Sequence, residues 1–372
     1  MKIHIWDLLK MGTTKIVVDI KDSLKKRMAY KIKDDIYNLS KELNIKPARL
    51  YEYFIWEKSP IPLNILFNIS NKINISKEEI ERNIILYKQL HTPCKNSIKN
   101  PKLPIEINPY FTSIIANLFF DGSVPKDGKG TYYSQKSKDM MEDFIKKVNY
   151  VFGDVFYSLK LDHRGILKCR IPRLIGEICR HVYSVPSFGT FDARIPQLVF
   201  NLEEDHKIAF ILTGIIDEGS IAYDGSIIFG VSNENMIYDF DNLCKEIGLN
   251  TAGVKKRQDS NHFYLYIKSR EKLYQIIMDF KKEYPFISLN KKENRLKKYL
   301  EIKNQRYLSK NSMNKSKENI LNEMKNKKCS INYLAEILSL DPRKLRRYTN
   351  ILIKEGKIKR HRYGKEFIYS LG

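Results

Sequence analysis

The sequence predicts an α+β protein with a core of two similar halves, flanked by two smaller, mainly helical regions. Two short apolar runs, 113–124 and 210–221, each end in one acidic residue followed by Gly-Ser. The acids, Asp121 and Glu218, are 97 residues apart. Three further residues recur at a separation of 96: Met140, Asp143 and Phe144 return as Met236, Asp239 and Phe240. An acid at the end of an apolar helix, repeated after one half, indicates two halves that bring two carboxylates together.

Each half is expected to run helix–strand–strand–helix–strand–strand–helix (αββαββα). In the first half, a strand pair after Asp121 precedes a helix at about 136–151, hairpin strands at 155–161 and 166–171, and a helix at 173–183. In the second half, strands 220–223 and 226–231 flank Asp224-Gly225, which is a strong two-residue hairpin signal. A helix at 235–247, strands at 254–257 and 262–268, and a helix at 270–280 follow. The predicted core spans 101–305, with halves at about 105–205 and 206–305.

The net charge of +23 is concentrated at the two ends of the chain. Residues 291–372 carry +15 and residues 1–100 carry +8, whereas residues 101–290 sum to zero. A basic excess of this size indicates a polyanionic partner, and nucleic acid is the commonest one. A Lys-, Ile- and Asn-rich composition also arises from a thermophilic or AT-rich source, but that origin does not explain why the charge gathers at the ends.

The N-terminal region, 1–100, contains apolar residues at helical spacing from 34 to 90, and the whole of that stretch is expected to be helical. Asn44-Ile45-Lys46 is a tight turn, and Pro47 suits the first turn of a second helix that runs to Trp56. This region resembles the helix-turn-helix of the Cro and phage-repressor type, in which the second helix enters the major groove. The resemblance implies DNA contacts from Lys46, Arg49 and Tyr53, with Glu52 on the same surface.

The C-terminal region, 315–372, combines helices at about 317–326 and 331–338 with a third helix that begins at Asp341-Pro342. Asp341 is an N-cap, Pro342 suits the first helical position, and Gly356 is placed to end the helix. Strands at 357–361 and 366–371 follow. This order resembles a winged helix, which implies a recognition helix and a wing that contact DNA. The implied contact residues are Arg343, Lys344, Arg346, Arg347, Arg360 and Arg362.

The core resembles a single-chain LAGLIDADG homing endonuclease over roughly 190 residues. The acid–glycine pairs that end the motifs match Asp121-Gly122 and Glu218-Gly219, and Ser123 and Ser220 match the serine that often follows. In this family the two motif helices pack side by side, and small residues such as Ala116 and Thr213-Gly214 stand where close contact is wanted. The stretch 193–200 is similar to an Arg-Ile-Pro-Glu segment of intein-borne relatives. Asp217 is an alternative second acid, but Glu218-Gly219 is the better match.

Two neighbouring carboxylates repel each other but hold hard, oxygen-preferring cations well. Such cations activate water and stabilise a leaving oxygen, which is the chemistry that phosphodiester hydrolysis needs. The resemblance implies Mg²⁺ bound by Asp121 and Glu218, with Mn²⁺ able to substitute and with backbone carbonyls near Phe120 and Asp217. The motifs contain no His or Cys, which argues against zinc. Related enzymes also use basic side chains near the metals, and the candidates here are Arg194 and Lys291.

The hairpins are expected to form two curved sheets that lie over double-stranded DNA. Strand alternation predicts that Lys168 and Arg170 share a face, and Lys160 is a further candidate on the neighbouring strand. In the second half Lys256 and Lys268 are candidates, with Tyr264 and Tyr266 between them. Polar contacts can read DNA without strong overall charge, so the neutral core is compatible with this role. The alternative is an ordinary solvated sheet face.

The leading functional prediction is a freestanding, site-specific, double-strand DNA endonuclease that acts as a monomer with two halves. The alternative is a DNA-binding transcriptional regulator that has kept the endonuclease fold without cleavage. Both acids favour the enzyme, and two additional DNA-binding regions favour the regulator. An RNA maturase is a third possibility, because the same fold assists intron splicing.

The location of the protein is predicted from what the sequence lacks. No apolar run approaches the ~18 residues that span a bilayer, and the N-terminus lacks the apolar segment of a signal peptide. The five cysteines (94, 169, 179, 244 and 329) show no metal-ligand spacing and fit a reducing compartment. A soluble, cytoplasmic protein is therefore expected.

Overall fold

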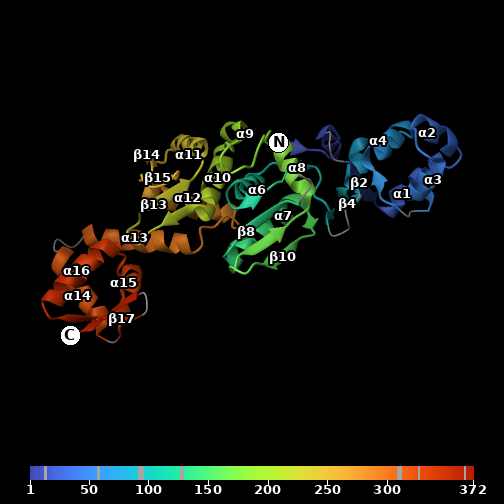
Figure 1. The fold of residues 1–372 in the computed structure, drawn as a ribbon. Helices are drawn as coiled ribbons and strands as arrows, with labels where there is room; N and C mark the ends of the chain where they lie inside the picture. Colours follow the sequence, from blue (N-terminus) through green and yellow to red (C-terminus); the bar gives the residue numbers. More distant parts are fainter. Residues whose placement is uncertain are drawn as a thin grey trace. The chain divides into compact units, whose positions relative to one another are not determined.

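The computed structural model describes residues 1–11, 15–56, 59–90, 96–125, 130–307, 312–325, 327–363 and 366–372. Helices and strands both contribute throughout, so the chain is a mixed α+β protein (Figure 1). It divides into two compact units, residues 1–213 and 214–372. In the part of the chain that the structure describes, no helix is long and apolar enough to cross a membrane.

The N-terminal part of the first unit is built on a five-stranded antiparallel sheet with the order β3-β2-β4-β5-β9. Its strands are β2 (Ile16–Ile20), β3 (Ile61–Pro62), β4 (Ile84–Gln89), β5 (Ser97–Lys99) and β9 (Asp154–Val155). The helices are η1 (Ile5–Met11), α1 (Asp22–Ile32), α2 (Ile36–Glu42), α3 (Pro47–Leu50), the π-helical segment η2 (Tyr51–Ile55), α4 (Leu63–Lys72) and α5 (Lys77–Asn83). A separate two-stranded ladder joins β1 (Lys2–Ile3) to β6 (Ile105–Glu106).

Two predictions for this part of the chain are wrong. The stretch 34–90 is not helical throughout, because Ile84–Gln89 forms β4 and pairs with β2. The predicted strand 155–161 is split, because Val155 in β9 pairs with Ile98 in β5, whereas the hairpin starts only at Ser158. Both errors have the same cause: the partner strand lies far away in the sequence, and pairing with it overrides the local pattern.

The remainder of the first unit is a four-stranded antiparallel sheet with the order β10-β11-β8-β7, together with its helices. The strands are β7 (Gly122–Ser123), β8 (Tyr132–Gln135), β10 (Ser158–Leu161) and β11 (Leu167–Arg170). The helices are α6 (Pro109–Phe120), α7 (Lys138–Phe152), α8 (Arg173–Val182) and α9 (Gln197–Asn201). Helix α10 (Glu204–Asp217) follows and carries the chain into the second unit.

The second unit begins with the same order of elements. Its sheet is β12-β13-β15-β14, which is the order of the first sheet when the matching strands are compared. The strands are β12 (Gly219–Ile221), β13 (Ile227–Val231), β14 (Thr251–Lys256) and β15 (Phe263–Ile267), and the helices are α11 (Glu234–Glu246), α12 (Arg270–Glu283) and α13 (Lys291–Tyr307).

The internal repeat that the sequence predicts recurs in local contacts. Ser137 accepts the first-turn hydrogen bond from the Met140 amide at 3.4 Å, and Asn233 accepts the equivalent bond from Met236 at 3.0 Å. The Phe144 ring packs on Tyr133 with centroids 4.5 Å apart, as Phe240 packs on Phe229 at 3.7 Å. Two of the three residue pairs that recur at a separation of 96 therefore serve the same purposes in α7 and α11: Met140 and Met236 in helix capping, and Phe144 and Phe240 in helix-to-sheet packing.

A C-terminal domain closes the second unit. It contains α14 (Ser312–Met324), β16 (Cys329–Ser330), α15 (Ile331–Leu338), α16 (Pro342–Lys354), β17 (Ile358–Tyr363) and β18 (Glu366–Leu371), with the sheet order β16-β18-β17. The predicted ends of α16 are confirmed: Asp341 accepts from the Arg343 amide at 2.6 Å, Pro342 opens the helix, and Gly356 has a φ of 72°. Leu334, Leu345 and Leu352 are fully buried in the domain's own core.

Candidate functional site

The end of α6 places Asp121 on a sharp turn. Asn108 caps the start of this helix by accepting from the Phe111 amide at 3.1 Å, and its residues are buried from Pro109 to Leu118. The amide of Asp121 donates to Asn117 at 3.2 Å and ends the helix. A Cβ on Gly122 would lie 2.5 Å from the Leu118 Cα, so only glycine allows the strand to turn back against the helix.

The carboxylate of Asp121 is half-buried and accepts a hydrogen bond from Gln135. The Gln135 Nε2 lies 3.2 Å from Asp121 Oδ2 and 3.3 Å from the Tyr133 hydroxyl. Gln135 comes from β8, next to β7, so the sheet itself brings the amide to the helix end. Gln135 was not among the predicted site residues, because nothing in a lone glutamine signals a partner fourteen residues earlier.

The end of α10 repeats this geometry. The Glu218 amide donates to Gly214 at 2.9 Å, and a Cβ on Gly219 would lie 2.7 Å from the Ile215 carbonyl oxygen and 2.8 Å from its Cα. Each glycine thus contacts the backbone four residues earlier. Glu218 itself is exposed, whereas Asp217, the alternative acid, is half-buried.

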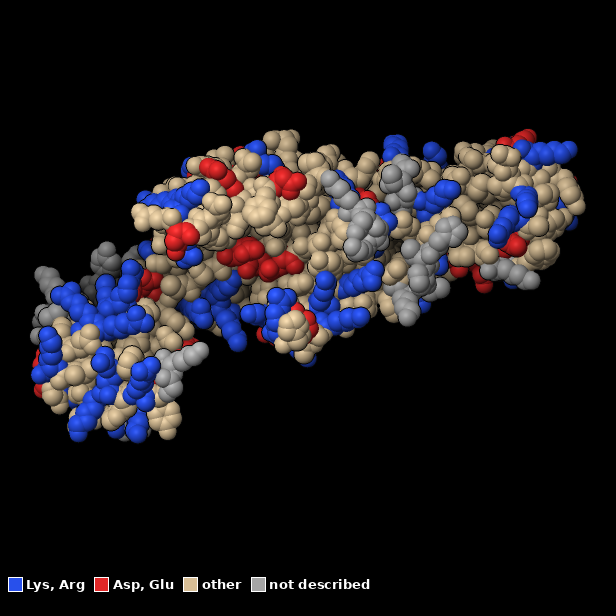
Figure 2. Space-filling model, viewed as in Figure 1, with Lys and Arg blue, Asp and Glu red and all other residues tan. Residues whose placement is uncertain are grey.

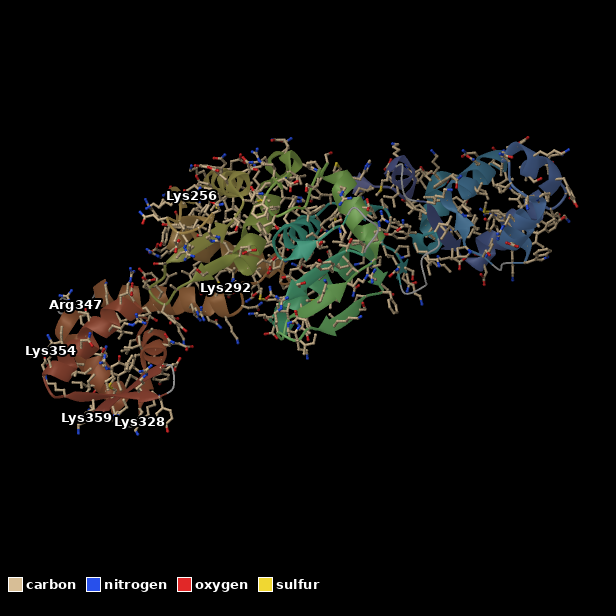
Figure 3. The ribbon with its side chains drawn as sticks, viewed as in Figure 1. Lys256, Lys292, Lys328, Arg347, Lys354 and Lys359 are labelled. Carbon is tan, nitrogen blue, oxygen red and sulfur yellow. The ribbon has the colours of Figure 1, made fainter. Side chains whose placement is uncertain are left out.

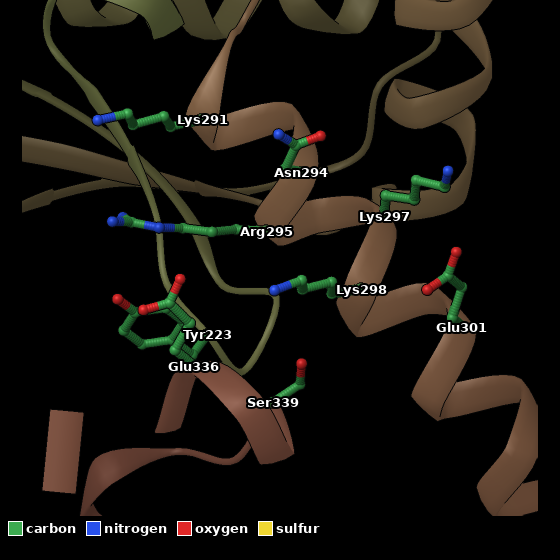
Figure 4. Close-up of a pocket in the computed structure, with 9 residues that line it drawn as sticks. All are labelled: Tyr223, Lys291, Asn294, Arg295, Lys297, Lys298, Glu301, Glu336 and Ser339. Atoms are coloured by element: carbon green, nitrogen blue, oxygen red, sulfur yellow. The ribbon is translucent and has the colours of Figure 1, made fainter. Parts of the chain in front are cut away.

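A lysine that the sequence analysis did not choose lies at the end of α10. The ammonium of Lys292, at the start of α13, donates to the carbonyl oxygens of Ile215, Ile216 and Gly219 at 2.9, 2.5 and 2.8 Å. These carbonyls lie where a helix leaves its last acceptors without partners, and where the helix dipole favours a cation. The predicted neighbour Lys291 instead extends to a cavity elsewhere in the second unit (Figure 4). Arg194 is exposed in the segment before α9.

Helix α6 and the 204–213 part of α10 pack together within the first unit through a buried polar chain. Thr213 Oγ1 donates to the Ala209 carbonyl at 2.7 Å, so it accepts from Ser113 Oγ at 2.6 Å. Ser113 in turn accepts from the buried Lys147 Nζ at 2.8 Å, and Lys147 also donates to Asn117 Oδ1 at 2.6 Å. The chain satisfies groups that would be costly to bury alone, and it fixes how the helices contact each other.

A second buried group joins the same two helices. Thr112 Oγ1 hydrogen-bonds to His206 Nδ1 at 2.7 Å and to the Tyr183 hydroxyl at 2.8 Å. Burial lowers the pKa of His206, an effect opposed by the charge of Glu203 and reinforced by the chain's N-terminus. His206 therefore favours its neutral form in the folded protein.

The exposed face of the first sheet is basic. The β10–β11 register pairs Lys160 directly with Lys168 and Ser158 with Arg170, so the three basic residues share one face. The Lys168 ammonium lies 3.4 Å from the centroid of the Tyr132 ring, and the Arg170 guanidinium packs over Gly130. Like charges directly opposite each other in a ladder are unfavourable. Their presence here suits a surface that contacts an anion.

The outer strand of the second sheet, β14, is irregular. A bulge between Thr251 and Val254, with Gly253 at a φ of 73°, pairs Lys255 with Tyr264 and Lys256 with Phe263. Lys255 therefore shares the face of Tyr264 and Tyr266, whose rings meet edge-on at 5.8 Å. The Lys256 ammonium lies 5.4 Å from the Phe263 ring (Lys256 is labelled in Figure 3). Lys268 is exposed just beyond β15.

The C-terminal domain is densely covered with Lys and Arg (Figure 2). On α16 the exposed basic residues are Arg343, Lys344, Arg346, Arg347 and Lys354. Arg343 is bound to Asp341 at 2.8 Å, and this bond lowers the pKa of the Asp341 carboxyl to about 2. On β17, Arg360 and Arg362 are exposed, and Arg360 lies 4.7 Å from the Phe367 ring. Gly364 and Lys365, at the predicted tip of the hairpin, lie outside the described residues.

The N-terminal candidates lie on or beside a short helix. Lys46 precedes α3 and is exposed, and Arg49 pairs with Glu52 at 2.6 Å. Tyr53 is half-buried, and this burial raises its pKa. The predicted helix 47–56 is present but changes to π geometry from Tyr51 onward, which leaves Trp56 about half exposed and stacked on Tyr51.

The described residues contain no group of three or more His, Cys, Asp or Glu side chains that could together hold a metal ion. A cation at either helix end would need backbone carbonyls, water or a bound phosphate to complete its shell. Mg²⁺ in phosphoryl-transfer sites commonly uses one or two carboxylates and substrate oxygens. The residues at Asp121 therefore fit such an ion only together with a phosphate-bearing ligand.

No protein-family model matches the sequence, and no curated protein matches it. Among solved structures, I-DmoI in complex with DNA and Mn is similar with 12% identity and a TM-score of 0.32, over 47% of this chain and 94% of that one. Full-length WhiA from Thermotoga maritima is similar with 12% identity and a TM-score of 0.36, over 66% and 90%. The N-terminal LAGLIDADG domain of WhiA is similar with 14% identity and a TM-score of 0.33, over 51% and 89%. With identities below 15% and TM-scores below 0.4, these similarities say nothing about what this chain does. Its function is inferred below from its own residues.

Proposed function

We propose that the protein is a site-specific double-strand DNA endonuclease of the LAGLIDADG homing type, acting as a monomer with two similar halves. The observation that carries the proposal is the repeated helix end. Both α6 and α10 stop at an acid followed by a glycine that contacts the backbone four residues earlier. A turn with a purely structural role would require only the glycine. The acid that precedes the glycine in both copies is the feature that suits metal-assisted hydrolysis of a phosphodiester.

In this proposal Asp121 and Glu218 are the catalytic carboxylates and hold Mg²⁺ or Mn²⁺ together with phosphate oxygens of the DNA. The bound ion would supply an activated water and stabilise the leaving oxygen. Gln135 holds the Asp121 carboxylate in one orientation through its hydrogen bond to Oδ2. Lys292 fixes the end of α10 through three carbonyls, which keeps Glu218 in place and adds a positive charge near the phosphate.

DNA binding is proposed to come mainly from three basic surfaces. The first is the sheet face with Lys160, Lys168 and Arg170, and the second is the face with Lys255 and Lys268. The third is the C-terminal domain, proposed to be a winged helix with α16 as its recognition helix and β17–β18 as its wing. A helix-turn-helix formed by α2 and α3 would add further contacts. Phosphate contacts of this kind supply affinity, and polar side chains on the sheets read sequence.

One observation favours the alternative, a DNA-binding regulator without cleavage. The carbonyl oxygens of Ile216 and Gly219, the residues that flank the pair Asp217-Glu218, already accept hydrogen bonds from Lys292. The resemblance to homing endonucleases implied that backbone carbonyls near Asp217 help to hold a metal. An ammonium that occupies those acceptors supplies a fixed positive charge at the second helix end without an ion.

The test is incubation of the full chain with Mg²⁺ and a randomised duplex library, followed by sequencing of cut ends and of bound, uncut DNA. Wild-type protein is expected to cut specific sites, and Asp121→Asn and Glu218→Gln are each expected to bind the same sites with little cutting. Cleavage that persists in both variants would refute the proposed site. Specific binding by all three proteins without any cleavage would establish the regulator.

A further inference from the structure

The second unit contains a cavity of about 620 Å³ between α13, the turn that joins β12 to β13, and α15 (Figure 4). Lys291, Arg295 and Lys298 lie four and three residues apart on α13, so they share one face of the helix. Figure 4 shows all three extending from α13 to the same side, toward the turn that carries Tyr223. These three cations line one wall of the cavity. Of the residues that line it, only Lys291 was among the site residues predicted from the sequence.

The lining of this cavity carries a net positive charge, because four of its side chains are cationic and two are carboxylates. Lys291, Lys297 and Lys298 form no ion pair in the described ranges of the chain, and the two glutamates at the edge, Glu301 and Glu336, form none with them. The α13 wall of the cavity therefore carries four cations, and among the described residues the two carboxylates do not pair with them. Closely spaced like charges on a helix are unfavourable by themselves, and an anionic ligand would relieve that repulsion.

The wall opposite α13 is held open by specific contacts. Gly225 has a φ of 75°, and a Cβ there would lie 2.4 Å from the Tyr299 ring. The Arg270 Nε donates to the Gly225 carbonyl at 2.5 Å, and the Arg295 guanidinium lies 4.9 Å from the Tyr223 ring. Tyr223 also packs against the apolar core of the C-terminal domain. The turn is thus fixed on both sides, so the cavity exists before any ligand arrives.

The cavity lies between two of the basic surfaces proposed above. Its turn continues into β13 of the second sheet, whose exposed face carries Tyr264 and Tyr266. On its other side, Arg343 at the start of α16 interacts electrostatically with Asp224 of the same turn and with Tyr266. A backbone that follows the sheet face to α16 would pass this turn. Ser339 and Asn294 add a hydroxyl and an amide that can donate to phosphate oxygens.

We infer that this cavity binds phosphate groups of the DNA backbone and so joins the contacts of the second sheet to those of the C-terminal domain. The inference rests on the proposed DNA binding. Flexible ammonium groups with hydroxyl and amide donors among them suit phosphodiester oxygens, which need charge and several donors but little shape selection. No base reading is expected at this position.

The experiment compares the full chain with Lys291→Gln/Lys298→Gln, and with a control of equal charge change on the exposed surface of α12, Lys272→Gln/Lys282→Gln. Affinity for one duplex is measured by fluorescence anisotropy from low to moderate salt. The cavity variant is expected to lower the slope of log affinity against log salt by about 1.8, because each lost phosphate contact removes about 0.9. The control is expected to leave the slope unchanged, and circular dichroism checks that both variants are folded.

A second arm titrates tripolyphosphate against the same proteins, which separates the DNA backbone from a small free polyanion as the ligand. Tight, variant-sensitive binding of tripolyphosphate with an unchanged DNA slope would overturn the assignment to DNA. Equal slopes for cavity variant and control would also overturn it. If wild-type protein does not bind DNA at low salt, the proposed function itself has failed, which is a separate result.

Discussion

At the scale of single residues, the end of α10 shows that two adjacent lysines can have entirely different contacts. Lys291 and Lys292 are identical and adjacent, yet only Lys292 reaches the carbonyls of Ile215, Ile216 and Gly219. The choice is made by the helical phase of α13, which turns consecutive residues by about 100°. The sequence predicted a basic residue near the end of α10, but it did not determine which of the two lysines this would be.

Lys292→Met should destabilise the protein by about 1–3 kcal/mol, because three buried or half-buried carbonyls lose a charged donor at a helix C-terminus. Lys291→Met is the matched control and should change the free energy of unfolding by no more than about 0.5 kcal/mol, since its side chain is exposed. Urea unfolding of the three proteins measures the difference. Equal effects of the two substitutions would contradict the role given to Lys292.

A pH dependence follows from His206. Burial lowers the pKa of this imidazole in the folded state, so the unfolded chain takes up a proton at a higher pH than the folded chain does. Stability should therefore fall as the pH drops below about 6.5, the ordinary histidine value, and the loss should level off below the folded-state pKa. Thermal melts of wild type and His206→Gln from pH 7.5 to 5 should show a steeper fall for wild type. Parallel curves would assign the pH dependence to other groups.

At the scale of elements, the repeated helix–glycine–strand unit determines how each strand packs against the helix that precedes it. Gly122 and Gly219 allow β7 and β12 to leave their helices at once, and this places the preceding acid on the turn. The matched contacts of Phe144 and Phe240 then hold α7 and α11 against their sheets. The same local rules, applied twice, produce the same strand order in both sheets.

Gly122→Ala and Gly219→Ala should each destabilise the protein by about 1–3 kcal/mol, because the new Cβ would overlap backbone atoms rather than a movable side chain. The neighbouring Ser123→Ala and Ser220→Ala serve as controls and should stay within about 0.5 kcal/mol of wild type. Equilibrium unfolding with parallel near-ultraviolet circular dichroism gives both stability and tertiary packing. A neutral result at either glycine would mean that this helix end is not built as described.

At the scale of the whole molecule, the net charge of +23 is distributed over surfaces that can be tested separately. The C-terminal domain has the most exposed cations, the first sheet has the directly paired Lys160 and Lys168, and the N-terminal candidates are fewer and partly paired. Counterion release depends on the number of phosphates contacted, so surfaces with more free cations should contribute more to the salt slope.

We expect Arg346→Gln/Arg347→Gln and Lys160→Gln/Lys168→Gln each to lower the salt slope by about 1–2, and Lys46→Gln/Arg49→Gln to lower it less, since Arg49 is already paired with Glu52. The three double variants carry the same change in charge, so each controls for the others. Anisotropy titrations on one duplex give the slopes. An equal reduction in all three would indicate a nonspecific effect of total charge.

Some features of this protein follow from the sequence alone because their causes are local. Asp341, Pro342 and Gly356 mark the ends of α16 through capping and φ preferences that act within a few residues. The acid–glycine pairs, the matched helices and the concentration of charge at the ends are likewise visible in the chain.

Other features were decided only by tertiary structure, because they depend on contacts between distant segments. The ladders that pair β4 with β2 and β9 with β5 override a helical pattern and split a predicted strand. The pairing of Lys255 with Tyr264 places Lys255 on the tyrosine face and Lys256 on the opposite face, which the sequence does not state. The bonds of Gln135 to Asp121 and of Lys292 to the end of α10 span 14 and more than 70 residues. Long-range geometry of this kind is determined by how the sheets and helices pack, and no local preference encodes it.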